Sequence, residues 1–547
     1  MSSEKKAVDH SHHLSDLARR HALSPLKGLQ KYYGKDLIPF AGGLPSPEYF
    51  PFTSVSAQVP LADAFPLDPP RSATSPVSSS PFGWLWRLFG ASKGDTTHVQ
   101  IPREPRQGDG GLNLSKALQY GPVTGLQPTQ AFVREFTQRI YAPAYDDWTT
   151  LAHAGNTDGW SRVAKLLLNP GDTLLVEEWT YPSALASARP IGARWKAVPM
   201  DGQGMRPDAL REILAGWDVE RDGPRPRVIY TVPVGQNPTG VTLGLERKKA
   251  IYDLCVQYDI IIAEDDPYYF LQVGEFVPKS LRKAERESAA GEDIARFIAS
   301  LVPTYLRVDT QGRVIRLDTF SKTIAPGVRL GWFTCSPLFA ERLERIGEVS
   351  TMSPCGLSQA LVVALLSRWT FDGYVRWLRG LRTQYKLRRD FFVDCLMEEF
   401  DVVPTPASAV PGAWVAAGDQ MTIVFSAYRR GSMDKEKPRP LLSFVPPSAG
   451  MFVWMELYFG DVPNQTDEDG SVVTPERQFF TRLADAGVLT APGWFFLPET
   501  HKTDSLPSSA ADHHIGHTRL SYTPSDAETT RRGVKIFAKT LREFCRV

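Results

Sequence analysis

The sequence lacks both a long apolar run and a strong net charge. No uncharged apolar stretch approaches the roughly 20 residues that a membrane-spanning helix needs, and the first residues, MSSEKKAVDHSHH, lack the apolar core of a secretory signal. The 62 Lys and Arg residues nearly balance the 61 Asp and Glu residues, so the net charge of +1 leaves no electrostatic footprint for nucleic acid. We therefore expect no membrane partner, no nucleic-acid partner and a cytoplasmic location.

The sequence also lacks closely spaced cysteines. Its five cysteines are scattered and odd in number, which is typical of reduced intracellular thiols: Cys255, Cys335, Cys355, Cys395 and Cys545. Two histidine groups stand out, His10, His12 and His13 near the start and His513, His514 and His517 near the end. We predict no metal site, because no cysteine completes one and the first group lies in a tail expected to be mobile. The second group is close to Arg519 in the sequence, so an alternative is that these histidines line a substrate pocket.

The chain is long enough for more than one core, with 547 residues of which 42% are hydrophobic. From Leu112 to Arg389, β-like and helical segments alternate, as a mainly parallel sheet requires. A helical run from Ser358 to Asp390 is expected to lead into a smaller α+β part. We predict an N-terminal arm (1–52), a Ser/Pro-rich insertion (53–109), a large domain (110–390) and a small domain (391–547) with an insertion near 404–447. A charged excursion is expected at 279–293.

The segment RLDTFSKTIAPGVRLGW, Arg316 to Trp332, carries the strongest chemical signal. Lys322 and Arg329 are seven residues apart, and the Pro-Gly pair between them predicts a turn rather than a continuous helix. A turn lets an amine and a guanidinium converge on one small anion. An amine that forms a Schiff base beside a phosphate clamp suggests pyridoxal phosphate, although a Ser-Lys pair taken alone is more often a solvated surface feature.

Two other predicted strands end in polar residues. Asp265 and Asp266 follow the apolar run Ile260 to Ala263, which is typical of a buried parallel strand. A buried carboxylate is costly without a cationic partner, and a protonated pyridine nitrogen would be one. The β-rich run Val228 to Val232 leads to Asn237. Because open α/β sheets bind ligands at the carboxyl ends of their strands, we expect these ends to line one crevice.

Together with AGGLPSPEYFPF (Ala41 to Phe52), ALQYGPVTGL (Ala117 to Leu126) and HTRLSYT (His517 to Thr523), these motifs occur in an order that resembles a known family. The chain is similar to the fold-type I pyridoxal-phosphate aminotransferases, in particular the fungal aromatic and 2-aminoadipate aminotransferases and the kynurenine aminotransferases. The resemblance covers most of the chain apart from the insertions. It implies an α/β fold with a mainly parallel sheet in the large domain, a smaller α+β domain, and pyridoxal 5′-phosphate as cofactor.

The resemblance assigns roles around the cofactor ring. Lys322 would hold the cofactor as an internal aldimine and then move the proton between the substrate Cα and the cofactor C4′. Asp265 would pair with the pyridinium nitrogen. Asn237 and Tyr268 would donate to the phenolate oxygen, and Tyr181 would stack on the ring.

The resemblance also assigns residues that would bind the cofactor phosphate. Arg329 and Thr319 would bind it as a charged fork and a hydroxyl donor, with threonine in place of the serine expected at that position. The other half of the cup would come from Gly155, Asn156 and Thr157, ahead of the helical stretch Val163 to Leu168. Relatives often have serine and glutamine where this chain has Asn156 and Thr157, so the backbone amides carry the greater weight.

Four further residues are assigned to the substrate and to a partner subunit. Tyr120 matches a tyrosine that relatives send across a homodimer interface to the partner's phosphate. Arg519 would clamp the substrate α-carboxylate. Gly43 lies in an arm that relatives fold over the active site, and Lys27 aligns with a basic residue, arginine in the family pattern, that reaches a distal carboxylate.

The expected activity is transfer of the amino group of an aromatic L-amino acid (tyrosine, phenylalanine or tryptophan) to a 2-oxo acid such as 2-oxoglutarate, by a ping-pong mechanism. The alternative donors are 2-aminoadipate and kynurenine. A pyridoxal-phosphate lyase or decarboxylase is less favoured, since it would use the same Lys322 and Asp265. A transcription regulator would need a basic winged-helix domain, and the roughly 40 residues before the AGGLP motif are too few for one.

Overall fold

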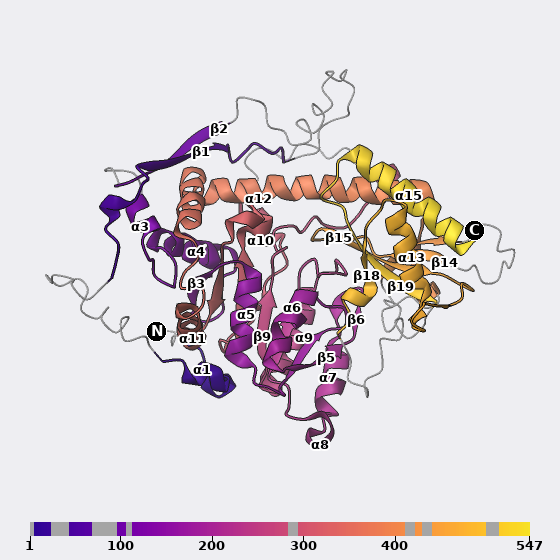
Figure 1. The fold of residues 1–547 in the computed structure, drawn as a ribbon, viewed down its shortest axis with the longest axis horizontal. Coiled ribbons are helices and arrows are strands. Elements are labelled where there is room, and N and C mark those ends of the chain that lie inside the picture. Colours follow the sequence, from indigo (N-terminus) through magenta and orange to yellow (C-terminus); the bar gives the residue numbers. More distant parts are fainter. Residues whose placement is uncertain are drawn as a thin grey trace.

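The computed structural model describes residues 5–22, 43–67, 96–104, 112–282, 294–410, 422–428, 440–498 and 514–546. Two sheets organise this part of the chain, and the long helix α12 (Gly356–Phe400) extends from one to the other (Figure 1). The predicted helix from Ser358 to Asp390 is therefore confirmed, and it is longer than expected. Thr370, with a φ of 64°, interrupts its regular geometry.

The first sheet has seven strands in the order β3-β11-β10-β9-β8-β4-β5. Their bounds are β3 Thr149–His153, β4 Thr173–Glu177, β5 Arg194–Val198, β8 Val228–Thr231, β9 Ile261–Asp265, β10 Val314–Thr319 and β11 Gly331–Cys335. Neighbours from β5 to β10 are parallel, whereas β11 is antiparallel to both β10 and β3. The α/β fold with a mainly parallel sheet is thus confirmed, and the carboxyl ends of all strands but β11 share one edge.

Helices cover both faces of this sheet, which explains why its central strands β4, β8 and β9 are buried along their length without alternation. Ile261 and Ile262, adjacent on β9, belong to separate buried clusters. The Ile262 cluster includes residues of α4 (Gln127–Ile140), α7 (Pro207–Ala215), α9 (Leu245–Gln257) and α12. The Ile261 cluster includes residues of α5 (Asn156–Leu167), α6 (Pro182–Ala188) and α11 (Pro337–Glu348).

The second sheet is antiparallel and has six strands in the order β12-β13-β14-β15-β19-β18. The strands are β12 Val403–Pro406, β13 Ile423–Tyr428, β14 Pro440–Phe444, β15 Phe452–Tyr458, β18 Ala491–Pro492 and β19 Ile515–Ser521. Its core joins the last turns of α12 to α13 (Pro475–Asp485) and α15 (Ala527–Cys545). Strands β13 and β14 come from the stretch 404–447, so this predicted insertion contributes to the sheet.

Residues 8–20 pack against the helices and loops that surround the first sheet. Helix α1 (Asp16–Arg20) lies in the predicted N-terminal arm, and the Ser15 amide donates to Leu166 O of α5 at 2.7 Å. His10 and His13 are each only 1% exposed. The expectation of a mobile tail is therefore wrong for this segment, because backbone hydrogen bonds and buried side chains hold it in place.

The predicted Ser/Pro-rich insertion is described only at its two ends. Strands β1 (Ser54–Pro60) and β2 (Thr96–Pro102) pair along their full length and lie against α12 (Figure 1). Residues 68–95, most of the charged excursion at 279–293, Lys27 and His513 lie outside the described residues. Among the described helices, none combines the length and the apolar character needed to cross a membrane.

Candidate active site

Asp265, the last residue of β9, is held by two side chains from neighbouring elements. Asn156, the first residue of α5, donates from Nδ2 to Asp265 Oδ1 at 2.6 Å, and the Tyr230 hydroxyl of β8 donates to Oδ2 at 2.6 Å. Burial raises the pKa of Asp265, and the two hydrogen bonds oppose this change. The arrangement fixes a buried carboxyl group that a nearby cation would keep ionised.

Lys322 ends a short 3-10 turn, Phe320–Lys322, directly after β10. The Thr319 hydroxyl caps this turn by accepting from the Ser321 amide at 3.1 Å, and the two hydroxyl oxygens lie 2.8 Å apart. Burial, followed by the charges of Arg329 and Arg519, lowers the pKa of Lys322. A lowered pKa favours the neutral amine, which is the nucleophilic and proton-accepting form.

Arg329 and Gly155 form a cradle at the start of α5. Arg329 donates from Nη2 to Ala154 O at 2.8 Å, and a Cβ added to Gly155 would overlap the Arg329 guanidinium. Gly155 also has a φ of 93°, so only glycine suits the position. Because the first amides of a helix have no partner within it, Asn156 and Thr157 add donors beside the guanidinium. These groups together suit a small anion.

Arg519 lies on β19 of the second sheet and contacts the loop at the carboxyl end of β8 in the first sheet. Its Nη1 donates to Asn237 Oδ1 at 2.6 Å, and its guanidinium lies 4.1 Å from the ring centre of Phe452 and 4.9 Å from that of Phe496. Burial lowers the pKa of Arg519, but an arginine remains charged at neutral pH. Since the oxygen of Asn237 accepts from Arg519, its amide nitrogen is the group that can donate to a ligand.

Two predicted tyrosines also lie at strand ends. Tyr268 is buried, meets Phe452 edge-on with ring centres 5.8 Å apart, and has a pKa raised by burial. Tyr181 is half-buried at the start of α6, after β4. His517, by contrast, lies in an aromatic cluster with Trp179 and Trp454, and it is 2% exposed.

Some predicted residues are exposed at the surface of the single chain. Tyr120 is 65% exposed, and Gly43 is exposed with no atom within 4 Å of a Cβ built on it. His514 is also exposed. In the described part of a single chain, Tyr120 and Gly43 are therefore exposed, whereas Lys322 is partly buried.

Three polar residues near the group were not found by sequence reasoning. Tyr230 binds Asp265, Ser321 adjoins Thr319, and Glu177 ends β4. Glu177 is buried, and burial raises its pKa to about 7. It accepts from Thr231 Oγ1 at 2.7 Å and from Gln236 Nε2 at 3.0 Å. Only Ser321 had a sequence signal, since it lies between Thr319 and Lys322 in the TFSK motif.

The residues present fit pyridoxal phosphate. The Gly155 cradle, which a Cβ would fill, offers donors to a phosphate, and Lys322 offers an amine to an aldehyde. The Asp265 carboxyl group suits a ring nitrogen, and Asn156 Oδ1 is buried without a hydrogen-bond partner among the described residues. Each functional group of the cofactor therefore has a chemically matched group at this edge.

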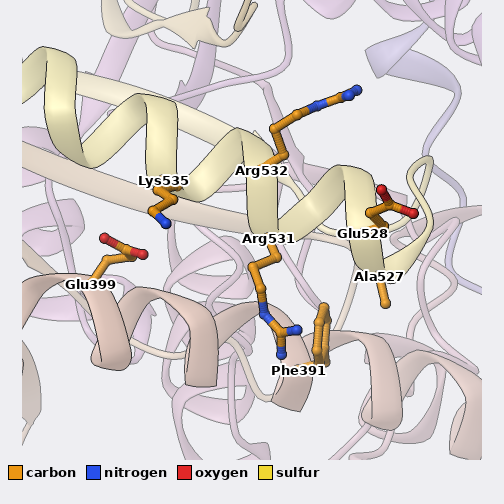
Figure 2. A pocket seen from close by; sticks show the side chains of 7 residues that line it. All are labelled: Phe391, Glu399, Ala527, Glu528, Arg531, Arg532 and Lys535. Atoms are coloured by element: carbon orange, nitrogen blue, oxygen red, sulfur yellow. The ribbon is translucent and has the colours of Figure 1, made fainter.

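A separate pocket of about 530 Å³ lies between α12 and α15 (Figure 2). Arg531, Arg532 and Lys535 line it together with Glu399 and Glu528. The charges are mixed, and none of the residues discussed above lines it. We therefore place the chemistry at the sheet edge rather than in this pocket.

Comparisons with known proteins agree with this geometry. Residues 89–411 match the model of the family described as aminotransferase class I and II. The chain is 34% identical to an aromatic amino acid aminotransferase of Schizosaccharomyces pombe, over 99% of this chain and 98% of that protein. It is 31% identical to an L-tyrosine:2-oxoglutarate aminotransferase of Tapinella panuoides, over 98% of this chain and 97% of that protein. The crystal structure of aminotransferase Aro8 from Candida albicans has a TM-score of 0.79, with 33% identity and full coverage of both chains.

Proposed function

Because the chain belongs to the class I and II aminotransferase family, we propose that it transfers the amino group of aromatic L-amino acids to a 2-oxo acid, 2-oxoglutarate in particular. The enzyme is a pyridoxal-phosphate-dependent aminotransferase and works in two ping-pong halves. Tyrosine, phenylalanine and tryptophan are the proposed donors. Two relatives support this choice, because their names specify aromatic donors and their similarity to this chain extends over nearly their whole length.

The observation that carries the proposal is the position of Arg519 between two aromatic rings, at the same edge as Lys322. A guanidinium binds both oxygens of a carboxylate, so Arg519 would hold the α-carboxylate of donor and acceptor alike. Phe452 and Phe496, which flank it, give an aromatic side chain apolar contacts. Bound substrate would thus be oriented with its Cα toward the amine.

Within this arrangement, each residue has a proposed task. The bound cofactor supplies an electron-withdrawing pyridinium ring. Asp265 keeps the ring nitrogen protonated, and Asn237 and Tyr268 donate to the ring oxygen, while Tyr181 stacks on the ring. The Lys322 amine would take the proton from the substrate Cα and deliver it to the cofactor C4′. The phosphate is held by Arg329, Thr319 and the start of α5, Gly155 to Thr157.

A donor and acceptor panel tests the reaction. Purified enzyme is expected to convert aromatic donors only when a 2-oxo acid is supplied, and Lys322→Ala is expected to lose both this activity and the absorbance band of lysine-bound cofactor. Lys249→Ala is the matched control, since Lys249 is half-exposed and pairs with Glu246 on the surface of α9. Release of carbon dioxide in place of a keto acid would contradict the proposal.

The same panel distinguishes the alternative donors. An enzyme that prefers 2-aminoadipate must hold a distal carboxylate, a role proposed for Lys27, with Gly43 in the arm near the substrate. Higher kcat/KM for 2-aminoadipate or kynurenine than for tyrosine would shift the assignment to those donors. In that case Lys27→Ala would raise the KM for 2-aminoadipate and leave that for tyrosine unchanged.

We also propose a homodimer in which Tyr120 reaches the partner's cofactor phosphate. Its 65% exposure, together with the exposed ring of Tyr49 (83%) in a turn that contacts the helix just before Tyr120, supports an interface at this surface. Light scattering should give twice the chain mass, and Tyr120→Phe should weaken cofactor binding. A monomer that retains full activity would refute this arrangement.

A cytoplasmic, biosynthetic role and the division into arm, insertion, large domain and small domain are likewise proposals. The cysteines of the described chain form no disulfide, which suits a reducing compartment. Fractionation of cells that express the protein would test the location. Limited proteolysis would test the boundary at 390/391, which falls inside α12; protection of this region would argue against a boundary there.

A further inference from the structure

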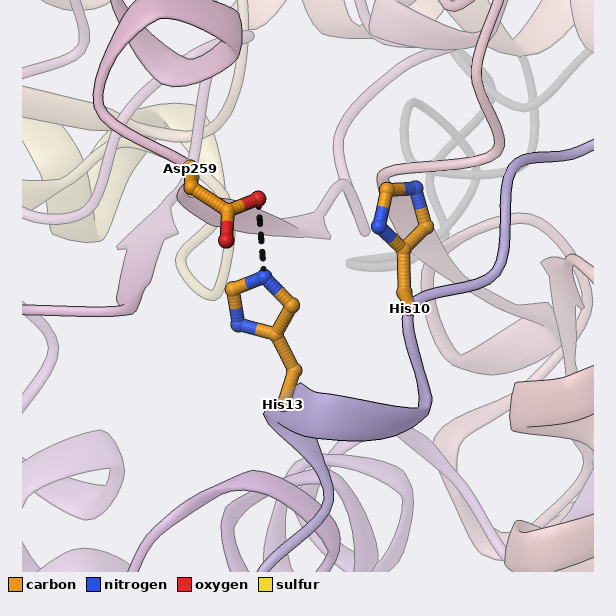
Figure 3. A group of neighbouring side chains, drawn as sticks. All are labelled: His10, His13 and Asp259. Carbon is orange, nitrogen blue, oxygen red and sulfur yellow. Dashed lines mark ion pairs between the residues drawn. The ribbon is translucent and has the colours of Figure 1, made fainter.

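Two histidines near the start of the chain meet an aspartate at the end of the first sheet opposite the candidate active site. His10 and His13 come from the N-terminal segment, and Asp259 lies just before β9, at the amino end of the strand whose carboxyl end carries Asp265 (Figure 3). One ligand atom from each lies within 4.8 Å of the other two. We propose that His10, His13 and Asp259 form a Zn²⁺ site that fastens the N-terminal segment to the first sheet.

The hydrogen bonding of His10 leaves the correct nitrogen for a metal. His10 Nε2 lies 3.0 Å from Gln311 O, and because a carbonyl oxygen only accepts, Nε2 carries the hydrogen. The lone pair is then on Nδ1, which is buried with no hydrogen-bond partner among the described residues. Metal-binding histidines commonly donate their other nitrogen to a backbone carbonyl in this way. The ring of Phe339 stacks on His10 and fixes its orientation.

The second and third ligands are already at bonding separation from each other. Zn²⁺ with bonds of about 2.0 to 2.1 Å to nitrogen and oxygen holds tetrahedral ligand atoms about 3.3 Å apart. His13 Nε2 lies 3.1 Å from Asp259 Oδ1. Only His10 needs to approach, by about 1.5 Å at most, to complete three protein ligands. A water molecule would take the fourth position, as in other three-ligand zinc sites.

The ligand types also suit a metal, because two imidazoles and a carboxylate are a set that Zn²⁺ accepts.

Arg313 limits the affinity of the site. Its Nη1 donates to Asp259 Oδ1 at 2.8 Å, which orients the carboxylate but also places a positive charge near the metal position. His12, whose Nε2 lies 2.6 Å from Asp259 Oδ2, holds the other oxygen. We therefore expect weaker binding than that of structural sites with cysteine ligands.

Zinc titration of the untagged full-length holoenzyme tests the site. After treatment with a chelator, calorimetry with Zn²⁺ alone should show one saturable site per chain. His10→Ala and His13→Ala should each weaken binding at least tenfold. His98→Ala is the matched control, because His98 is an exposed histidine on β2, and it should bind Zn²⁺ like the unmodified chain.

Two further measurements keep the result clear if an alanine variant folds poorly. Asp259→Asn keeps the shape of the side chain and should also lose the site. Co²⁺ added to the unmodified holoenzyme should give the visible absorption of a four-coordinate ion and be displaced by Zn²⁺. The proposal is overturned if no saturable binding occurs, if the Co²⁺ spectrum is that of a six-coordinate ion, or if the His10→Ala/His13→Ala variant binds as the unmodified chain does.

Discussion

The Tyr230 hydroxyl is the contact whose removal gives the sharpest expectation. It donates at 2.6 Å to Asp265 Oδ2, and both side chains are buried. Tyr230→Phe removes this donor and leaves the ring in place, so packing between β8 and β9 is preserved. Asp265 would then keep only the Asn156 donor.

The size of the effect follows from the chemistry of the contact. A hydrogen bond to a charged group is worth about 1.5–3 kcal/mol, and each 1.36 kcal/mol is a factor of ten. If Asp265 pairs with the ring nitrogen, we expect cofactor affinity to fall by about tenfold to about 150-fold. The hydrogen bond lowers the pKa of Asp265, so its loss raises that pKa, and the defect should be greatest at acidic pH.

Cofactor titration by absorbance, repeated from acidic to alkaline pH, measures this loss. Tyr305→Phe is the matched control, since Tyr305 is equally buried and its hydroxyl has no hydrogen-bond partner among the described residues. Equal cofactor affinities for the two variants would refute the role assigned to Tyr230. A pH-independent loss in Tyr230→Phe alone would show that packing, rather than the carboxylate, was disturbed.

Three other substitutions test other parts of the structure. Gly155→Ala should weaken cofactor binding in absorbance titrations far more than Gly171→Ala does, because both have positive φ but only the first places a methyl group in the arginine cradle. The pKa of Glu177 is raised from 4.5 to about 7, so the wild-type protein should lose up to about 3 kcal/mol of stability as pH rises through this range. Glu177→Gln should remove that loss in denaturant unfolding at pH 5 and 8, and an unchanged pH dependence would exclude Glu177 as its source. Arg316→Met should cost on the order of 3–5 kcal/mol in unfolding, because Arg316 is buried among three carboxylates, whereas Arg221→Met at an exposed pair should cost little.

Two central strands of the first sheet, β8 and β9, could be predicted because their signals are local. Each contains an apolar run, as Ile260 to Ala263 is before Asp265, and burial on both faces demands this composition. The order of motifs also identified the family, which the comparisons confirm. The turn at Pro326 was predicted for the same reason, since proline and glycine act on their immediate neighbours.

Contacts between distant parts of the chain could not be predicted. Tyr230 meets Asp265 only because β8 and β9 are paired in a particular register. The docking of His10 depends on Gln311, about 300 residues later. A tail with few apolar residues resembles a mobile segment unless its backbone partners are known, and those partners are visible only in the fold.

The position of Arg519 depends on how the two sheets are placed, because Asn237 lies in the loop after β8 of the first sheet, Arg519 lies on β19 of the second, and the two side chains are joined by a hydrogen bond. Close to that bond, the loop after β8 and the loop before β15 approach so tightly that a Cβ on Gly235 would lie 2.6 Å from the Gly450 nitrogen. The Gly450 amide also donates to Leu271 O at 3.0 Å, in the loop that carries Tyr268. A misplacement of about 1 Å can cost a hundredfold in rate. The absence of side chains at Gly235 and Gly450 lets these loops approach closely, and we therefore expect substitutions there to change the distance between the Arg519 guanidinium and the Lys322 amine.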